Sequence, residues 1–306
     1  MERGLLSDPQ LAKHYDGVVW MYLFQDFSHS DADRAAERLA IRFGISSWPQ
    51  HFLVDPFTLA KMADTGRSLD AFRAAVARAP VNGGTPSPSA PELAAADTLA
   101  ASLEKGGDVK LAKQHLRHAD RVVAFRALQI VVKKAPQDLV AESSWLLAVP
   151  NDQIRGQVCD VLAEHGDVEA RDALHGIVRD PGQSENPNVL RMRAVKALGR
   201  CGDGSSLQVV QPFAVSGAWR NGLTSTAVQT VAAIGERVKK SKADAVAILA
   251  QAYPPVPAGE NAASEQRMCE ALAKNVHDAL QKLAGRKVPF PGEYDDAARK
   301  KLMASW

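Results

Sequence analysis

An internal repeat constrains the fold of this 306-residue chain more than any other feature. Small and apolar residues at helical spacing, followed by a polar break, recur along its second part. The copies are AFRALQIVVKKAP (124–136), QVCDVLAEHGD (157–167), RAVKALGRCGD (193–203) and QTVAAIGERVK (229–239), with a looser one, VHDALQKLAGR (276–286). Val158, Ala194 and Thr230 follow one another in steps of 36 residues. A period of this length predicts supersecondary units that bury their apolar faces by stacking on their neighbours.

A second amphipathic helix is predicted between successive copies. The stretches are VEARDALHGIVRD (168–180), SSLQVVQPFAV (205–215) and KADAVAILAQAY (242–253). Two helices per unit predict an all-α solenoid over residues 92–285. The Gly-Asp pairs at 166–167 and 202–203 resemble those of HEAT repeats, particularly the short HEAT-like class of phycobilin lyases. No lyase site is present, so the resemblance implies the fold only. Armadillo units have a similar period, so they remain an alternative interpretation of the repeats. The sequence signature of tetratricopeptide repeats is absent. Residues 286–306 resemble tails that follow HEAT-like arrays in large bacterial proteins.

A change of composition separates this solenoid from the first part of the chain. The stretch PVNGGTPSPSAP (80–91) is rich in Gly, Pro and Ser, and we place a linker at 81–91. Before it, helical and strand patterns alternate, which predicts an α/β domain over residues 1–80. We expect helices at 5–15, 30–44 and 68–79, strands at 18–24 and 51–55, and a third strand at 58–62 with a turn at 64–66.

Three motifs in this first part resemble those of the thioredoxin-like fold. They are Leu-Ser-Asp-Pro (6–9), Phe-Gly-Ile (43–45) and Trp48-Pro49 before a strand. By this resemblance, Pro49 corresponds to the cis-proline opposite the active-site dithiol, and Trp48 stands where the family more often has Thr, Ser or Val. The family's first strand and Cys-x-x-Cys do not occur in residues 1–80. We therefore expect a multidomain protein: a partial, redox-inactive thioredoxin-like domain followed by a HEAT-like solenoid. Either the chain starts at an internal methionine or the domain is degenerate; Pro49 as an ordinary turn proline also stays open.

Composition narrows the function classes. The 37 basic and 35 acidic residues leave a net charge of +2, which predicts no nucleic-acid partner. Apolar runs are too short to span a bilayer, so no membrane insertion is expected. The N-terminus lacks a secretory h-region, so we expect a cytoplasmic protein as given; with an extended N-terminus the compartment is unknown. Three widely spaced cysteines predict buried free thiols rather than disulfides or a zinc site.

No residue set predicts catalysis, a metal site or a cofactor. His115 and His118 lie three residues apart on a predicted helix without a third ligand, which indicates a solvated polar face. The basic stretches 133–134 and 237–242 fall at helix ends, where cations complement the macrodipole. Cys201 also ends a helix, where the dipole disfavours a thiolate. Phosphate loops, nucleophile elbows and zinc-protease motifs are absent from the sequence.

These observations predict an interaction scaffold that binds a protein through its solenoid, with a part in redox homeostasis suggested only by the thioredoxin-like resemblance. Trp145, Trp219 and Tyr253 are candidate partner anchors if they are exposed. The alternative is a thiol–disulfide oxidoreductase whose Cys-x-x-Cys lies upstream of Met1. The chain as given is then expected to be inactive, and only an extended chain would be an enzyme.

Overall fold

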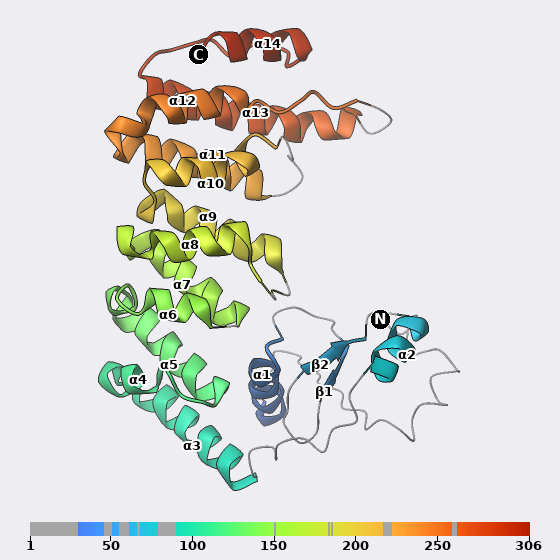
Figure 1. Cartoon of the computed structure of the whole chain (residues 1–306), viewed down its shortest axis with the longest axis vertical. Coiled ribbons are helices and arrows are strands. Elements are labelled where there is room, and N and C mark those ends of the chain that lie inside the picture. Colours follow the sequence, from blue (N-terminus) through green and yellow to red (C-terminus); the bar gives the residue numbers. More distant parts are fainter. Residues whose placement is uncertain are drawn as a thin grey trace. The chain divides into compact units, whose positions relative to one another are not determined.

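The computed structural model describes residues 30–45, 51–54, 61–65, 68–78, 90–149, 151–182, 184, 186–216, 222–258 and 262–306. Over these residues the protein is predominantly helical, with fourteen α-helices and one two-stranded antiparallel sheet (Figure 1). The chain divides into two compact units, Met1–Val131 and Val132–Trp306.

The first unit contains the helix and strand patterns that precede the predicted linker. Helix α1 (Asp31–Phe43) begins at Ser30, whose hydroxyl accepts a hydrogen bond from the Asp33 N–H at 3.1 Å. It ends at Gly44, whose φ of 71° lies in the left-handed region that favours glycine. The helix predicted at 30–44 is thereby confirmed.

A short hairpin follows α1. Strand β1 (Phe52–Val54) pairs antiparallel with β2 (Lys61–Asp64), and Phe52 lies opposite Asp64. The strand predicted at 51–55 is confirmed. The strand predicted at 58–62 overlaps β2 but ends later, because pairing with β1 continues to residue 64, where a turn was expected; residues 58–60 lie outside the described residues. Helix α2 (Leu69–Arg78) confirms the helix predicted at 68–79.

The sheet lies between α1 and α2. Phe72 of α2 packs with Leu53, Leu69 and Val76. On the opposite face, the buried α1 residues Ala40 and Phe43 pack with Phe52 and Val54. Successive strand residues point to opposite faces of a sheet, so β1 supplies one residue to the first cluster and two to the second. The predicted segments at 5–15 and 18–24 lie outside the described residues, so the thioredoxin-like fold stays a prediction.

Helices after the predicted linker belong to the same compact unit as α1. They are α3 (Ala90–Gly106), α4 (Val109–His115) and α5 (Arg121–Lys134). Arg42 of α1 forms ion pairs with Asp97 of α3 at 2.7 Å and with Asp120, which caps α5, at 3.0 Å. The Arg42 side chain is only 10% exposed, so these contacts are well shielded from water. The two compact units divide within α5. Residues 81–89 lie outside the described part of the chain, so the linker placed at 81–91 stays a prediction.

The second unit contains the repeats. Its elements are η3 (Pro136–Leu139), α6 (Ser143–Ala148), α7 (Asp152–His165), η4 (Val168–Ala170), α8 (Arg171–Arg179), α9 (Pro187–Cys201), α10 (Gly204–Ala214), α11 (Gly222–Arg237), η5 (Lys239–Ser241), α12 (Lys242–Gln251), α13 (Ala262–Ala284) and α14 (Asp296–Ala304). The copies at 157–167, 193–203 and 229–239 lie in α7, α9 and α11, and their predicted partners lie in α8, α10 and α12. Figure 1 shows these helices stacked in chain order, a solenoid-like arrangement.

Corresponding residues make corresponding hydrogen bonds in successive repeats. The backbone N–H groups of Gly166, Gly202 and Val238 each donate to the carbonyl four residues earlier, at 3.0, 2.7 and 2.8 Å. Val158, Ala194 and Thr230 are all buried. The Thr230 hydroxyl donates to the Val195 carbonyl of the preceding repeat at 2.9 Å. The period read from the sequence is thus a period of packing as well.

The C-terminal segment is part of the folded core rather than a separate tail. The Tyr294 hydroxyl donates to the Pro254 carbonyl at 2.6 Å, and Trp306 Nε1 donates to the Tyr253 hydroxyl at 3.0 Å. His277 Nε2 lies 2.7 Å from the Val288 carbonyl, which only accepts, so this nitrogen carries the proton. Its Nδ1 then accepts from the Tyr253 hydroxyl at 2.8 Å. The segment 286–306 therefore covers the last helices, as a capping unit does in a solenoid.

Candidate functional site

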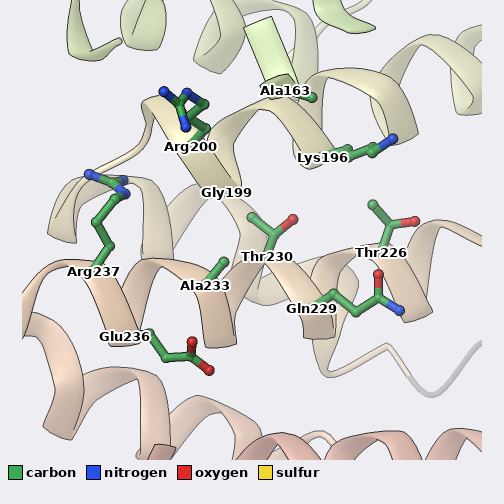
Figure 2. A pocket seen from close by; sticks show the side chains of 10 residues that line it. All are labelled: Ala163, Lys196, Gly199, Arg200, Thr226, Gln229, Thr230, Ala233, Glu236 and Arg237. Atoms are coloured by element: carbon green, nitrogen blue, oxygen red, sulfur yellow. The ribbon is translucent and has the colours of Figure 1, made fainter. Parts of the chain in front are cut away.

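A pocket of about 540 Å³ lies on the first helices of three successive repeats (Figure 2). We call it the first-helix pocket. It is lined by Ala163 of α7, by Lys196, Gly199 and Arg200 of α9, and by Thr226, Gln229, Thr230, Ala233, Glu236 and Arg237 of α11. The stacking of the repeats, rather than one helix or loop, creates this site.

Small residues leave room for the pocket. Ala163 and Gly199 occupy the same position in successive repeats, 36 residues apart, and Ala233 lies beside Gly199 on the next helix. A Cβ atom added at Gly199 would lie 3.6 Å from the Ala233 Cβ, which is an ordinary contact. A long side chain at any of these three positions would fill the hollow between α9 and α11.

Two arginines of the pocket are held by backbone carbonyls of the preceding repeat. Arg200 Nε donates to the Gly166 carbonyl at 3.0 Å, and the Arg237 guanidinium donates to the Gly202 carbonyl. Both carbonyls follow the last turn of a first helix, where backbone acceptors lack intrahelical partners. Arg237 lies in the last turn of α11, as the sequence predicted for the basic stretch 237–242, and it also contacts the end of the neighbouring first helix. Each guanidinium is thereby positioned at the pocket while keeping its charge.

Positive charge exceeds negative charge around the pocket. Lys196, Arg200 and Arg237 are cations, and Glu236 is the one acidic residue among the lining residues. Glu236 also forms an ion pair with Lys282 of α13 at 2.9 Å, which offsets its charge. Within the described part of the chain, no carboxylate forms an ion pair with Lys196. Three cations and one anion give the ten lining residues a net charge of +2.

The threonine hydroxyls of the pocket are already used as donors. Thr226 Oγ1 donates to the Gly222 carbonyl at 2.8 Å, and Thr230 Oγ1 donates to the Val195 carbonyl at 2.9 Å. Neither hydroxyl is placed beside a base that would activate it as a nucleophile. The side chains of Lys196, Gln229 and Glu236 are exposed, so the polar groups offered by the pocket suit binding rather than bond cleavage.

Of the partner anchors and groove residues proposed from the sequence, the two that the structure describes, Trp145 and Tyr253, do not line this pocket. Trp48, Pro49 and Trp219 lie outside the described residues, so their proposed roles stay predictions. Trp145 is half-buried on α6. Tyr253 is only 1% exposed because the C-terminal segment covers it, so it is a core residue and not a surface anchor.

The two histidines considered for metal binding lie side by side near the end of α4. Their ring centroids are 5.8 Å apart, and His118 Nδ1 accepts a hydrogen bond from the Asp120 N–H at 3.0 Å. That nitrogen is therefore committed to the turn before α5. Over the described ranges, no group of three or more His, Cys, Asp or Glu side chains is arranged to hold a metal ion.

All three cysteines are free and buried, as their spacing predicted. Desolvation by burial raises the pKa of Cys159 to about 12 and the pKa values of Cys201 and Cys269 to about 11. Because the thiolate is the reactive form, such thiols are poor nucleophiles near neutral pH. These cysteines pack within the helices and do not form a site for thiol chemistry.

No described helix combines the length and apolar character needed to cross a membrane. No known protein family, curated protein or solved structure matches this chain.

Proposed function

We propose that this protein is an interaction scaffold, an α-solenoid of HEAT-like repeats that binds a protein partner through the first-helix pocket. The observation that carries the proposal is the pocket itself, which three successive repeats build from equivalent helices. Stacked repeats offer extended surfaces of this kind, and such surfaces are used for binding. A redox-inactive thioredoxin-like segment precedes the scaffold in this proposal, supported by a sheet with a helix packed on each face.

The chemistry of the described side chains also favours binding over catalysis. The pocket offers cations, an exposed amide and small residues, without a paired nucleophile and base. The thiols that a redox enzyme would need are buried, with raised pKa values. Most apolar side chains of α7, α9 and α11 are buried in the core, and the exposed Val189 of α9 does not line the pocket, so the polar lining is the recognition surface there.

Site-specific photo-crosslinking tests the proposal with a matched control. A photoreactive amino acid replaces Gln229 on α11, which lines the pocket, or Gln208 on α10, which is equally an exposed glutamine but lies on a second helix. In cells that express the full chain, irradiation should give a discrete protein adduct with the Gln229 variant and not with the Gln208 variant. Equal adducts from both positions, or none from Gln229, would refute a partner site at the pocket.

A further inference from the structure

We infer that the first-helix pocket binds an acidic, extended segment of its protein partner. The inference rests on the proposed function and adds the chemistry of what is bound. Three observations support it: the excess of positive charge among the lining residues, the position of the pocket across three successive repeats, and the hydrogen bonds that hold its arginines to backbone carbonyls.

The charge excess is concentrated at the pocket. The whole chain carries a net charge of +2, and the ten lining residues alone carry the same value. The single acid, Glu236, is paired with Lys282 and so competes little for the pocket cations. A partner with carboxylates would supply the complement that the protein itself lacks here.

Both pocket arginines, Arg200 and Arg237, keep N–H donors and positive charge available for a carboxylate. Each donates to a backbone carbonyl, which is uncharged, so its positive charge is not neutralised within the protein. A guanidinium has five N–H donors, and one such contact leaves others for a carboxylate. Holding these side chains in place beforehand also reduces the entropy lost on binding.

The pocket runs across three helices, which favours an extended occupant. Packed helices lie about 8–10 Å apart, so the step from α7 to α11 covers about 16–20 Å. An extended peptide rises about 3.3 Å per residue, so about five or six residues would cover this distance. The lining includes no aromatic side chain among the described residues. Since single-stranded nucleic acids bind largely by stacking on aromatics, the pocket favours a peptide over a nucleic acid.

Lys196 gives the sharpest test because it is exposed and has no ion pair with a described carboxylate, so its replacement leaves the core unchanged. Lys300 on α14 is an exposed lysine outside the pocket and serves as the matched control.

Fluorescence anisotropy of the full chain would use three labelled probes: a short peptide alternating Glu and Ser, its Gln counterpart, and an oligothymidine of equal charge.

The Glu peptide should bind more tightly than the Gln peptide, and its affinity should fall as salt rises from about 0.05 M to about 0.5 M. Lys196→Gln should weaken it about two- to fivefold and Lys196→Glu about tenfold, as expected for partly exposed ion pairs. Lys300→Gln should leave it unchanged. Circular dichroism confirms that each variant is folded.

Equal binding of both peptides, no binding of the Glu peptide, or equal losses with Lys196→Gln and Lys300→Gln would overturn the inference. Tighter, Lys196-dependent binding of oligothymidine would overturn it in favour of nucleic acid. If Gln229 is crosslinked to a partner while the Glu peptide fails to bind, the acidic-segment inference falls and the scaffold proposal stands. If neither is observed, both fall.

Discussion

Two glycines at the same repeat position should respond in opposite ways to the same substitution. Gly199 in α9 and Gly235 in α11 are 36 residues apart, and both lie inside helices. Replacing glycine by alanine in a helix interior stabilises it by about 0.5–1 kcal/mol, because glycine loses more backbone entropy on folding. The sign of the total effect depends on what the new Cβ meets.

At Gly199, the added Cβ would lie 3.6 Å from the Ala233 Cβ, in ordinary van der Waals contact. Gly199→Ala should therefore stabilise the protein by about 0.5–1 kcal/mol. At Gly235, the Cβ would lie 2.6 Å from the Ala245 Cβ and 3.0 Å from Leu283 Cδ2. Carbon atoms prefer about 3.5–4.0 Å, so α11 and α12 would have to separate by about 1 Å.

Overpacking of this kind costs about 1–3 kcal/mol, which exceeds the gain in helix propensity. Gly235→Ala should therefore be net destabilising, by about 1–2 kcal/mol. Gly176→Ala in α8, where no atom lies within 4 Å of the new Cβ, should behave like Gly199→Ala.

Urea unfolding followed by circular dichroism gives the midpoints of the three variants. Hydrogen exchange of peptides from α11 adds a local readout, since repeat arrays need not unfold in one step. The Gly235 variant should unfold at lower urea and exchange faster in α11. A Gly235→Ala midpoint at or above that of Gly199→Ala would show that α11 and α12 do not approach as closely as described.

Two further predictions concern titratable groups. The three cysteines should resist alkylation at about pH 8 in the native chain and react after unfolding in urea, because burial raises their pKa values to between about 11 and about 12; labelling of the native chain as fast as the unfolded one would contradict this. Hydrogen bonds from Ser205, together with Arg171, lower the pKa of Asp203 to about 2, so its ionised form contributes stability above about pH 4 that is lost as the pH falls toward about 2. The melting temperature of Asp203→Asn should therefore fall furthest below that of the wild type above about pH 4 and match it near about pH 2, and a gap independent of pH would contradict this origin.

Periodicity predicted the parts of the fold that depend on local pattern. The first and second helices of the repeats follow from apolar spacing and from the polar break at residues such as Gly166 and Gly202. Helix α1 follows from its cap-type residues and Gly44. The closing segment escaped prediction because its Pro, Gly and aromatic residues have no helical period. Tyr294 and Trp306 find their partners about 40 and 53 residues earlier in the chain.

The first-helix pocket escaped prediction for a different reason, which is that its two arginines do not follow the 36-residue spacing of the repeat. A step of 36 residues makes Arg200 equivalent to Glu236 and Cys201 equivalent to Arg237. In this alignment, none of the lining positions carries a cation in both α9 and α11, so the repeat pattern by itself does not indicate a cationic site.

In the structure, Arg200 and Arg237 are equivalent because each donates to the same kind of backbone carbonyl in the preceding repeat. Arg200 and Arg237 are 37 residues apart, yet they donate to the carbonyls of Gly166 and Gly202, which are 36 apart. The arginine side chain is long enough to reach the equivalent carbonyl from a position one residue later in the helix. In α9, Cys201 turns inward and its thiol lies 3.5 Å from the Leu162 carbonyl. In α11, moving the arginine one position later lets Glu236 pair with Lys282, so both arginines keep their charge for a partner.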